Sequence, residues 1–457
     1  MENNVKSIVN NYRVIDLQSD FSYDLSCVYG IDNLLTTDKM ICEFLSIHNT
    51  NLDIYKLDKV KQADLIWDEL FIKRTPLSDN CIEIISIIKS IGLEQFIMNL
   101  DLNGIRNYFG VNGINSSNIN EYTDKIFDLS GVNYTITSTK IFDKNEIIYL
   151  ENRFTPKKND IVLYKKNNIT EKVKILDCHC LQGYPLNYNI LFDNGKEKNT
   201  LWNYLFMCDE QFNKITKRFK NSLNIDILLR DYNKCLNNGL IKKYGFNENI
   251  DGVRDYLLYW FHVLRPKCFS MSLENEIDYD FVNVDTDWIG NVSQILSTII
   301  IPLSIELNIP ISIKFENTKF LDVCDRSNLY SLFKLCKTFP KCKFIICFLC
   351  KVNYNKIFWL SKECSNLHIH GCFLNNLKIT KEITTNTFDV FSLNFSFHYS
   401  GSTVLEHFIY KWKQYKKIII DILIDKYKKL ELLGVIISKK NIERDVDILF
   451  NHSYLNL

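Results

Sequence analysis

The chain has 457 residues, of which 46% are hydrophobic and 13% aromatic, and this composition excludes a largely disordered protein. A chain of this length predicts either several domains or one large barrel with additions. Its 55 Lys and Arg residues against 54 Asp and Glu residues give a net charge of +1, which provides no global field for nucleic acid or an anionic membrane.

The 15 cysteines lie within apolar runs such as 343–350 (KFIICFLC). The N-terminal segment lacks the apolar core of a signal peptide, and no apolar run reaches the roughly 18 residues that cross a bilayer. We therefore expect buried thiols in a reducing, cytoplasmic compartment, no membrane partner and no strong nucleic-acid binding.

The first part of the chain, residues 1–154, begins with a short predicted strand at Val14–Leu17 and continues as an N-terminal helical region. Apolar residues at helical spacing predict helices at Thr37–Ile47, Val60–Phe71 and Cys81–Ile91. This region therefore carries one strand and several helices, and it contains no extended polar linker.

Residues 155–201 form a different pattern, with short alternating strands and no helix. The predicted strands are Asp160–Lys166, Glu171–Cys178, Leu186–Asp193 and Lys196–Thr200, with a hairpin turn at Asn194-Gly195. The segment resembles Tudor and other SH3-like barrels, which bind methylated lysine or arginine in an aromatic cage. The cage candidates are Tyr164, Tyr184, Tyr188 and Phe192. Strand alternation also explains Tyr188 and Phe192 as core residues.

Residues 202–457 alternate apolar strands with amphipathic helices, a pattern typical of a parallel sheet with helical crossovers. Predicted strands lie at Ile311–Phe315, Phe344–Leu349, Leu367–His370 and Leu393–Phe397. Three closing helices are expected at Thr403–Tyr415, Lys417–Leu433 and Lys440–Phe450. The fold class that follows is an α/β (β/α)8 TIM barrel with an inserted all-β module.

Catalytic groups of such barrels sit at the C-terminal ends of the strands, and here those ends carry few of them. Asp16, Gln18 and Asp20 alternate along the first strand and share one face. His398 ends the last strand without a carboxylate beside it. A divalent cation requires more strong donors than these residues provide, so we expect no metal and no cofactor.

Several long strings resemble the uronate isomerase family, a branch of the metal-dependent amidohydrolase superfamily. These are Gln62–Pro76 (QADLIWDELFIKRTP), Asn366–Asn376 (NLHIHGCFLNN), Val404–Trp412 (VLEHFIYKW) and the pair Asp425–Tyr427 and Ile442–Val446. They occur in the family's order and span both ends of the chain. The resemblance implies the barrel fold, aldose–ketose isomerisation of a uronate and a tendency to form homo-oligomers.

The sequence departs from the family at positions where the resemblance implies the metal-binding site. The resemblance implies metal-binding histidines at the positions of Gln18 and Asp20, and a metal-binding aspartate and an arginine at those of Gly401 and Thr403. None of the four family residues is present. Selective loss at the site beside intact scaffold strings indicates a chain retained for its shape.

We therefore interpret the chain as a catalytically inactive, uronate-isomerase-like pseudoenzyme that acts as an interaction or scaffold protein with a protein partner. Two alternatives stay open. One is a metal-dependent isomerase or hydrolase of altered chemistry that uses Asp16, Asp20 and His398 with a different cation. The other is a reader of methylated lysine or arginine peptides through the inserted module, with the barrel as its support.

Overall fold

The computed structural model describes residues 1–19, 21, 29–47, 53–111, 119–166, 169–181, 184–237, 239–273, 292–315, 326–348, 354–372, 377–393 and 395–451. The chain divides into two compact units. The first combines both ends of the chain, residues 1–135 and 370–456, and the second consists of residues 136–369.

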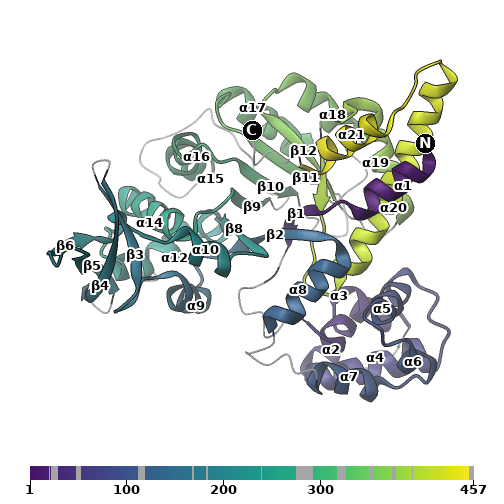
Figure 1. Ribbon diagram of the computed structural model, residues 1–457, viewed down its shortest axis with the longest axis horizontal. Coiled ribbons are helices and arrows are strands. Elements are labelled where there is room, and N and C mark those ends of the chain that lie inside the picture. The colour runs from purple at the N-terminus through teal and green to yellow at the C-terminus, as the bar shows by residue number, and fades with distance from the viewer. Residues whose placement is uncertain are drawn as a thin grey trace. The chain divides into compact units, whose positions relative to one another are not determined.

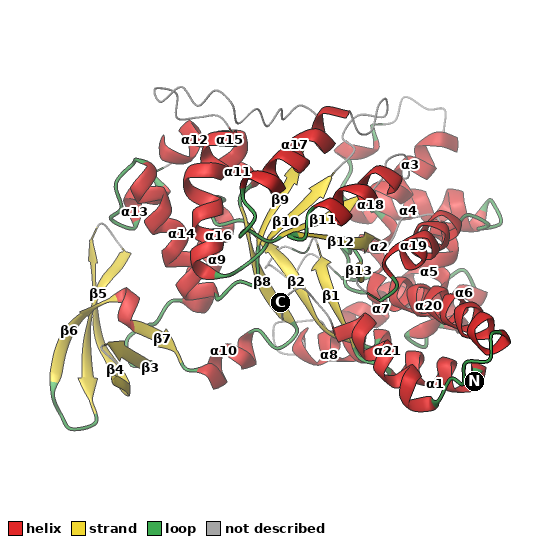
Figure 2. Ribbon diagram, turned by 90° about the horizontal axis from the view of Figure 1, so that it is seen from above, coloured by secondary structure: helices red, strands yellow, loops and turns green. Residues whose placement is uncertain are grey.

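Eight strands form one sheet in the order β1-β2-β8-β9-β10-β11-β12-β13, which is their order along the chain apart from an insertion after β2. Their bounds are β1 Val14–Ser19, β2 Val132–Thr139, β8 Phe219–Asn224, β9 Phe269–Leu273, β10 Ile311–Phe315, β11 Phe344–Phe348, β12 Leu367–Cys372 and β13 Ser396–Tyr399. The pairs β8–β9, β9–β10, β10–β11 and β12–β13 are parallel. Helices run between successive strands (Figure 2), the α/β arrangement that the alternation of elements predicted.

In the described residues, eleven helical segments of the second unit lie before and after the insertion, α9 before it and the others after it. They are α9 Lys144–Phe154, α10 Asp209–Ile215, α11 Asp226–Arg230, α12 Tyr232–Asn237, α13 Leu240–Lys243, α14 Ile250–Leu264, α15 Val292–Ile295, a π-helical turn at Leu296–Ile300, α16 Ile301–Leu307, α17 Arg326–Thr338 and α18 Tyr354–Glu363. α14 begins at Asn249, whose side chain accepts a hydrogen bond from the N–H of Gly252, and it ends at Arg265 in the left-handed region.

The first unit contains the remaining helices. They are α1 Glu2–Asn11, α2 Ile31–Leu35, α3 Asp38–Ile47, α4 Lys59–Trp67 with a π-helical turn at Asp68–Ile72, α5 Asp79–Ser90, α6 Glu94–Met98, α7 Leu102–Val111, α8 Ile119–Ser130, α19 Leu377–Phe391, α20 His407–Leu432 and α21 Lys439–Asn451. In Figure 1 the purple α1 and the yellow α20 and α21 lie together, although they come from opposite ends of the chain.

The expectation of two closing helices separated near Lys416 is wrong, because α20 is one helix of 26 residues. Lys416 is buried in it, and its Nζ donates to the carbonyl oxygens of Asn10 (3.1 Å) and Tyr12 (2.8 Å). The sequence predicts a helix boundary at this lysine. In the structure the lysine instead connects α20 to the end of α1 by hydrogen bonds.

The sequence does not predict strands β2 and β8, because several of their buried residues are polar. In β2, Thr135, Thr137 and Thr139 are buried, and in β8 Asn221 and Ser222 are buried. The Nδ2 of Asn221 donates to the backbone carbonyl of Leu264 at 2.6 Å, and the hydroxyl of Ser222 donates to the backbone carbonyl of Thr137 at 3.0 Å. Hydrogen bonds of this kind make a polar strand interior stable, since each buried donor finds an acceptor.

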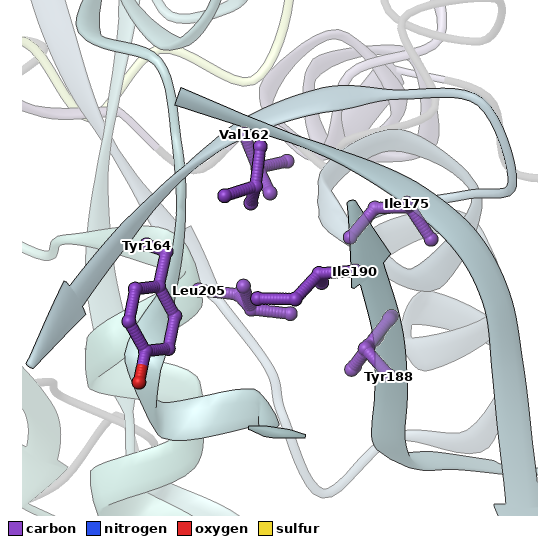
Figure 3. Packing of buried hydrophobic residues seen from close by; sticks show 7 residues of the cluster. Val162, Tyr164, Ile175, Tyr188, Ile190 and Leu205 are labelled. Atoms are coloured by element: carbon purple, nitrogen blue, oxygen red, sulfur yellow. The ribbon is translucent and has the colours of Figure 1, made fainter. Parts of the chain in front are cut away.

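A separate five-stranded antiparallel sheet occupies the insertion, in the order β6-β5-β4-β3-β7. Its strands are β3 Ile161–Lys166, β4 Ile169–Leu181, β5 Tyr184–Phe192, β6 Glu197–Leu201 and β7 Leu205–Met207. Figure 3 shows its core, in which Val162, Tyr164, Ile175, Tyr188, Ile190 and Leu205 converge from four strands together with Val173. The four predicted strands are present, and a fifth, β7, pairs with β3 beyond the predicted segment.

None of the helices in the described ranges is long and apolar enough to cross a membrane. Nine described cysteines are free thiols. Six of them are buried: Cys81, Cys235, Cys268, Cys336, Cys342 and Cys364.

Candidate functional site

Asp16 lies in the middle of β1, and its side chain is fully buried. Its Oδ1 accepts a hydrogen bond from the hydroxyl of Thr135 on β2 at 3.3 Å, and its Oδ2 accepts one from the indole Nε1 of Trp412 on α20 at 2.9 Å. Each carboxylate oxygen therefore has a donor from a different element of the first unit. Asp16 joins β1, β2 and α20.

The chain after β13 contains the position where the family resemblance implies a metal carboxylate. That position is Gly401, which has a φ of +53° and no side chain. Ser402 beside it is fully buried, and Thr403 is exposed. The buried Lys411 of α20 donates to the carbonyl of Ser400 at 2.6 Å. This end of β13 is thus fastened to α20 by a lysine and offers no carboxylate.

A buried carboxyl that sequence analysis did not single out lies just before α20. The side chain of Glu406 is fully buried, and its Oε1 accepts hydrogen bonds from the N–H of Gly30 at 2.9 Å and the hydroxyl of Tyr122 at 2.6 Å. Burial raises the pKa of Glu406 to about 6, although the bonds from Tyr122 and Gly30 oppose this rise. Its one signal in the sequence is an acidic residue inside the apolar string Val404–Trp412.

Three polar atoms near this carboxyl have no hydrogen-bond partner and are buried: Ser402 Oγ, Glu406 Oε2 and His407 Nδ1. Burial lowers the pKa of His407 well below its ordinary value, and the charges of Lys411 and Lys39 add to the effect, so the imidazole is neutral. Buried polar atoms of this kind are usually satisfied by an ordered water. An ordered water bound to these atoms is therefore expected near the start of α20.

The described residues do not fit the divalent metal that the resemblance implies. Among the residues that the structure describes, no three His, Cys, Asp or Glu side chains come together to hold a metal ion. Both oxygens of Asp16 are engaged with donors of the fold, and Gly401 has no donor. The side chains of Gln18, Asp20 and His398 lie outside the described part of the structure.

The aromatic candidates of the insertion have different environments. Tyr164 and Tyr188 belong to the buried core of the five-stranded sheet, and Phe192 is partly buried against it. The ring of Tyr164 contacts Phe192 with centroids 5.5 Å apart and Tyr204 with centroids 6.2 Å apart. The side chain of Tyr184 lies outside the described residues. Burial favours the core interpretation of Tyr188, and the residues at the edge of the cluster are Phe192 and Tyr204.

Solved structures with this fold are found among uronate isomerases. The crystal structure of a uronate isomerase from Bacillus halodurans C-125 matches with a TM-score of 0.75 and 24% sequence identity, covering 98% of this chain and 94% of that chain. That of the uronate isomerase from Thermotoga maritima matches with a TM-score of 0.63 and 9% identity, covering 99% and 96%. No family model and no curated protein matches the sequence. The expected α/β fold, with a parallel sheet and a separate antiparallel sheet, is confirmed by this likeness.

If Asp16 supports the fold, removing its indole donor destabilises the protein. We expect Trp412→Phe to lower the free energy of unfolding by about 1–3 kcal/mol, because a buried carboxylate oxygen loses its hydrogen bond. Urea unfolding followed by circular dichroism measures the change. The control is Trp359→Phe at a side chain that is 70% exposed, which we expect to change stability by less than about 0.5 kcal/mol. Equal unfolding midpoints for the two variants would contradict this role of Asp16.

The raised pKa of Glu406 predicts a pH dependence of stability. The folded protein binds this proton more tightly than the unfolded chain, since the pKa rises from 4.5 to about 6. The stability contributed by the protonated group is present below pH 4.5 and is lost as the pH rises through about 6. The loss amounts to about 2 kcal/mol for a shift of this size.

In Glu406→Gln this loss is expected to disappear, because the amide stays neutral and its oxygen still accepts from Gly30 and Tyr122. Urea unfolding at pH 4.5 and pH 7 compares this variant with wild type. Glu431→Gln, at an exposed glutamate, is the control that keeps the wild-type difference. A Glu406→Gln variant with that same difference would refute the assignment.

Proposed function

We propose that this chain keeps the uronate isomerase fold without the isomerase reaction and acts as a binding or scaffold protein. The observation that carries the proposal is the end of β13, where Gly401 stands at the position of a family metal ligand and the neighbouring Ser402 is fully buried. Gly401 supplies no carboxylate at this position to hold a metal-bound substrate.

The chemistry of the reaction supports the same proposal. Aldose–ketose isomerisation moves a proton between adjacent carbons, so it requires a placed base and a fixed cationic or metal partner for the substrate oxygens. Asp16, the family residue that persists on β1, accepts hydrogen bonds on both of its oxygens, from the indole of Trp412 and the hydroxyl of Thr135. A carboxylate held in this way at full burial serves the fold and has no access to a sugar.

The scaffold we propose is a closed (β/α)8 barrel. The eight-stranded sheet runs in chain order, and its two outermost strands, β1 and β13, lie against each other in the first unit. Contact between the first and last strand is what closure of a barrel requires. Barrel surfaces of this size serve as platforms for a protein partner or a second copy of the chain.

A direct assay distinguishes this proposal from an active isomerase. We expect purified protein to carry no stoichiometric metal by inductively coupled plasma mass spectrometry and to leave D-glucuronate unchanged. The uronate isomerase of Bacillus halodurans, assayed in parallel, is the positive control. Stoichiometric metal together with hexuronate isomerisation would overturn the proposal. Stoichiometric metal that Asp20→Asn abolishes, without isomerisation, would support the enzyme of altered chemistry.

A second function, recognition of a methylated peptide, draws support from the five-stranded sheet. Its order places the last strand, β7, beside the first, β3, after a 3-10 turn at Trp202–Tyr204, which is the arrangement of SH3-like and Tudor barrels. Its rings already hold ammonium groups, since Lys166 Nζ lies 4.3 Å from the ring centroid of Tyr204 and Lys198 Nζ lies 4.9 Å from that of Tyr164. Rings that attract these cations are suited to a methylammonium group.

Binding of trimethyl-lysine peptides by the full chain tests this second function. We expect Phe192→Leu to weaken binding by about tenfold, because it removes the ring that packs against Tyr164 and keeps an apolar side chain. Fluorescence anisotropy with matched unmethylated peptides measures the difference. Ile169→Leu, at an exposed residue of β4, is the control variant. Equal affinity for methylated and unmethylated peptides would rule this function out.

A further inference from the structure

The connection between α20 and α21 displays a group of aliphatic side chains to solvent. We call residues 430–436 (LELLGVI) the apolar tip. Leu432 is 87% exposed, Leu433 80%, Val435 46% and Ile436 90%. Leu432 and Ile436 are the two most exposed of the large hydrophobic residues that the structure describes. Apolar residues gathered in this way on a surface mark an interaction site more often than single exposed ones do.

Backbone hydrogen bonds hold the apolar tip in this conformation. The N–H groups of Leu433 and Val435 both donate to the carbonyl of Leu430 at 3.0 Å, and Gly434 has a φ of +86°. This is the glycine-dependent ending typical of an α-helix. The hydroxyl of Ser438 then accepts from the N–H of Asn441 at 3.2 Å and begins α21. The aliphatic side chains are therefore presented by a fixed turn, which prevents them from folding back onto the protein.

Lysines surround the apolar tip on both helices. Residues 426–440 contain five lysines and one acidic residue, Glu431. Lys429 pairs with Asp425 at 2.7 Å and Lys439 with Glu443 at 3.6 Å, and in each case the acid lies one helical turn farther from the tip than its lysine. The charge next to the aliphatic residues is therefore positive, and these lysines are exposed.

We propose that the apolar tip docks on the surface of an anionic lipid bilayer, with its aliphatic side chains at the boundary of the acyl chains and its lysines against the headgroups. Exposed aliphatic residues next to lysines are the combination that binds such surfaces. The attachment is peripheral, because no described helix is able to span a membrane.

A protein partner fits the apolar tip less well. A stable protein interface buries about 800 Å² on each side and relies on aromatic or arginine residues at its centre. The tip offers five exposed aliphatic side chains on one short turn, and residues 428–440 contain no Trp, Tyr, Phe or Arg. Its aliphatic side chains suit a fluid lipid surface, which needs no shape complementarity.

Vesicle binding by the full chain tests the proposal. We expect wild-type protein to cosediment with vesicles of equimolar phosphatidylcholine and phosphatidylserine, and to bind pure phosphatidylcholine and high-salt samples more weakly. The double variant Leu432→Asp/Ile436→Asp should weaken vesicle binding by at least tenfold. It removes two aliphatic side chains from contact with the lipid and adds two negative charges that the anionic headgroups repel.

The matched control is Leu77→Asp/Met98→Asp, which adds the same two charges at side chains 78% and 83% exposed elsewhere in the first unit. It should bind vesicles as wild type does. Leu432→Gln/Ile436→Gln repeats the test without added charge, and thermal unfolding checks that every variant is folded.

Absence of vesicle binding, or equal loss in tip and control variants, overturns the proposal. A second result also overturns it: wild-type protein does not bind vesicles but forms a concentration-dependent dimer in sedimentation velocity, and the tip variants stay monomeric. The apolar tip then binds a second copy of the chain.

Discussion

The buried carboxylate of Asp16 is the interaction on which the first unit depends. The hydrogen bond from Trp412 to Asp16 joins residues 396 positions apart, and that from Thr135 adds the neighbouring strand. A carboxylate taken out of water is tolerated only when donors surround it, so β1, β2 and α20 must meet at this point. The same two chain ends meet again where Lys416 binds the carbonyls of Asn10 and Tyr12 and where the hydroxyl of Tyr12 donates to Asp447 at 2.6 Å.

The contacts between the chain ends are independent of any metal. They require the apolar residues of α20 and the donors of Asp16. Gly401, at a position where the resemblance implies a metal ligand, contributes no side chain to them. Glu406, which accepts hydrogen bonds from Gly30 and Tyr122, also joins segments that are distant in the sequence.

Two features outside the eight-stranded sheet carry the binding proposals. The five-stranded sheet has its own core around Tyr188 and Ile190, with Phe192 and Tyr204 at the edge of that core. The apolar tip lies in the first unit at the far end of α20, where a glycine turn displays leucine and isoleucine to solvent. The apolar tip follows the end of α20, and the five-stranded sheet is inserted between elements of the second unit. Extra residues at such places lower the stability of a fold only slightly.

Sequence alone determined the α/β class, the extent of β10 at Ile311–Phe315 and the strands of the inserted antiparallel sheet, because alternating burial leaves a pattern in neighbouring residues. The loss of the family's site residues at Gln18, Asp20, Gly401 and Thr403 stays a prediction from the family resemblance. Only the tertiary structure decided which polar residues are buried: the threonines of β2, Asn221 of β8, Lys416 within α20, and Asp16 beneath Trp412. The physical reason is that a polar residue enters the core when a partner distant in sequence satisfies it, and no local pattern encodes that partner.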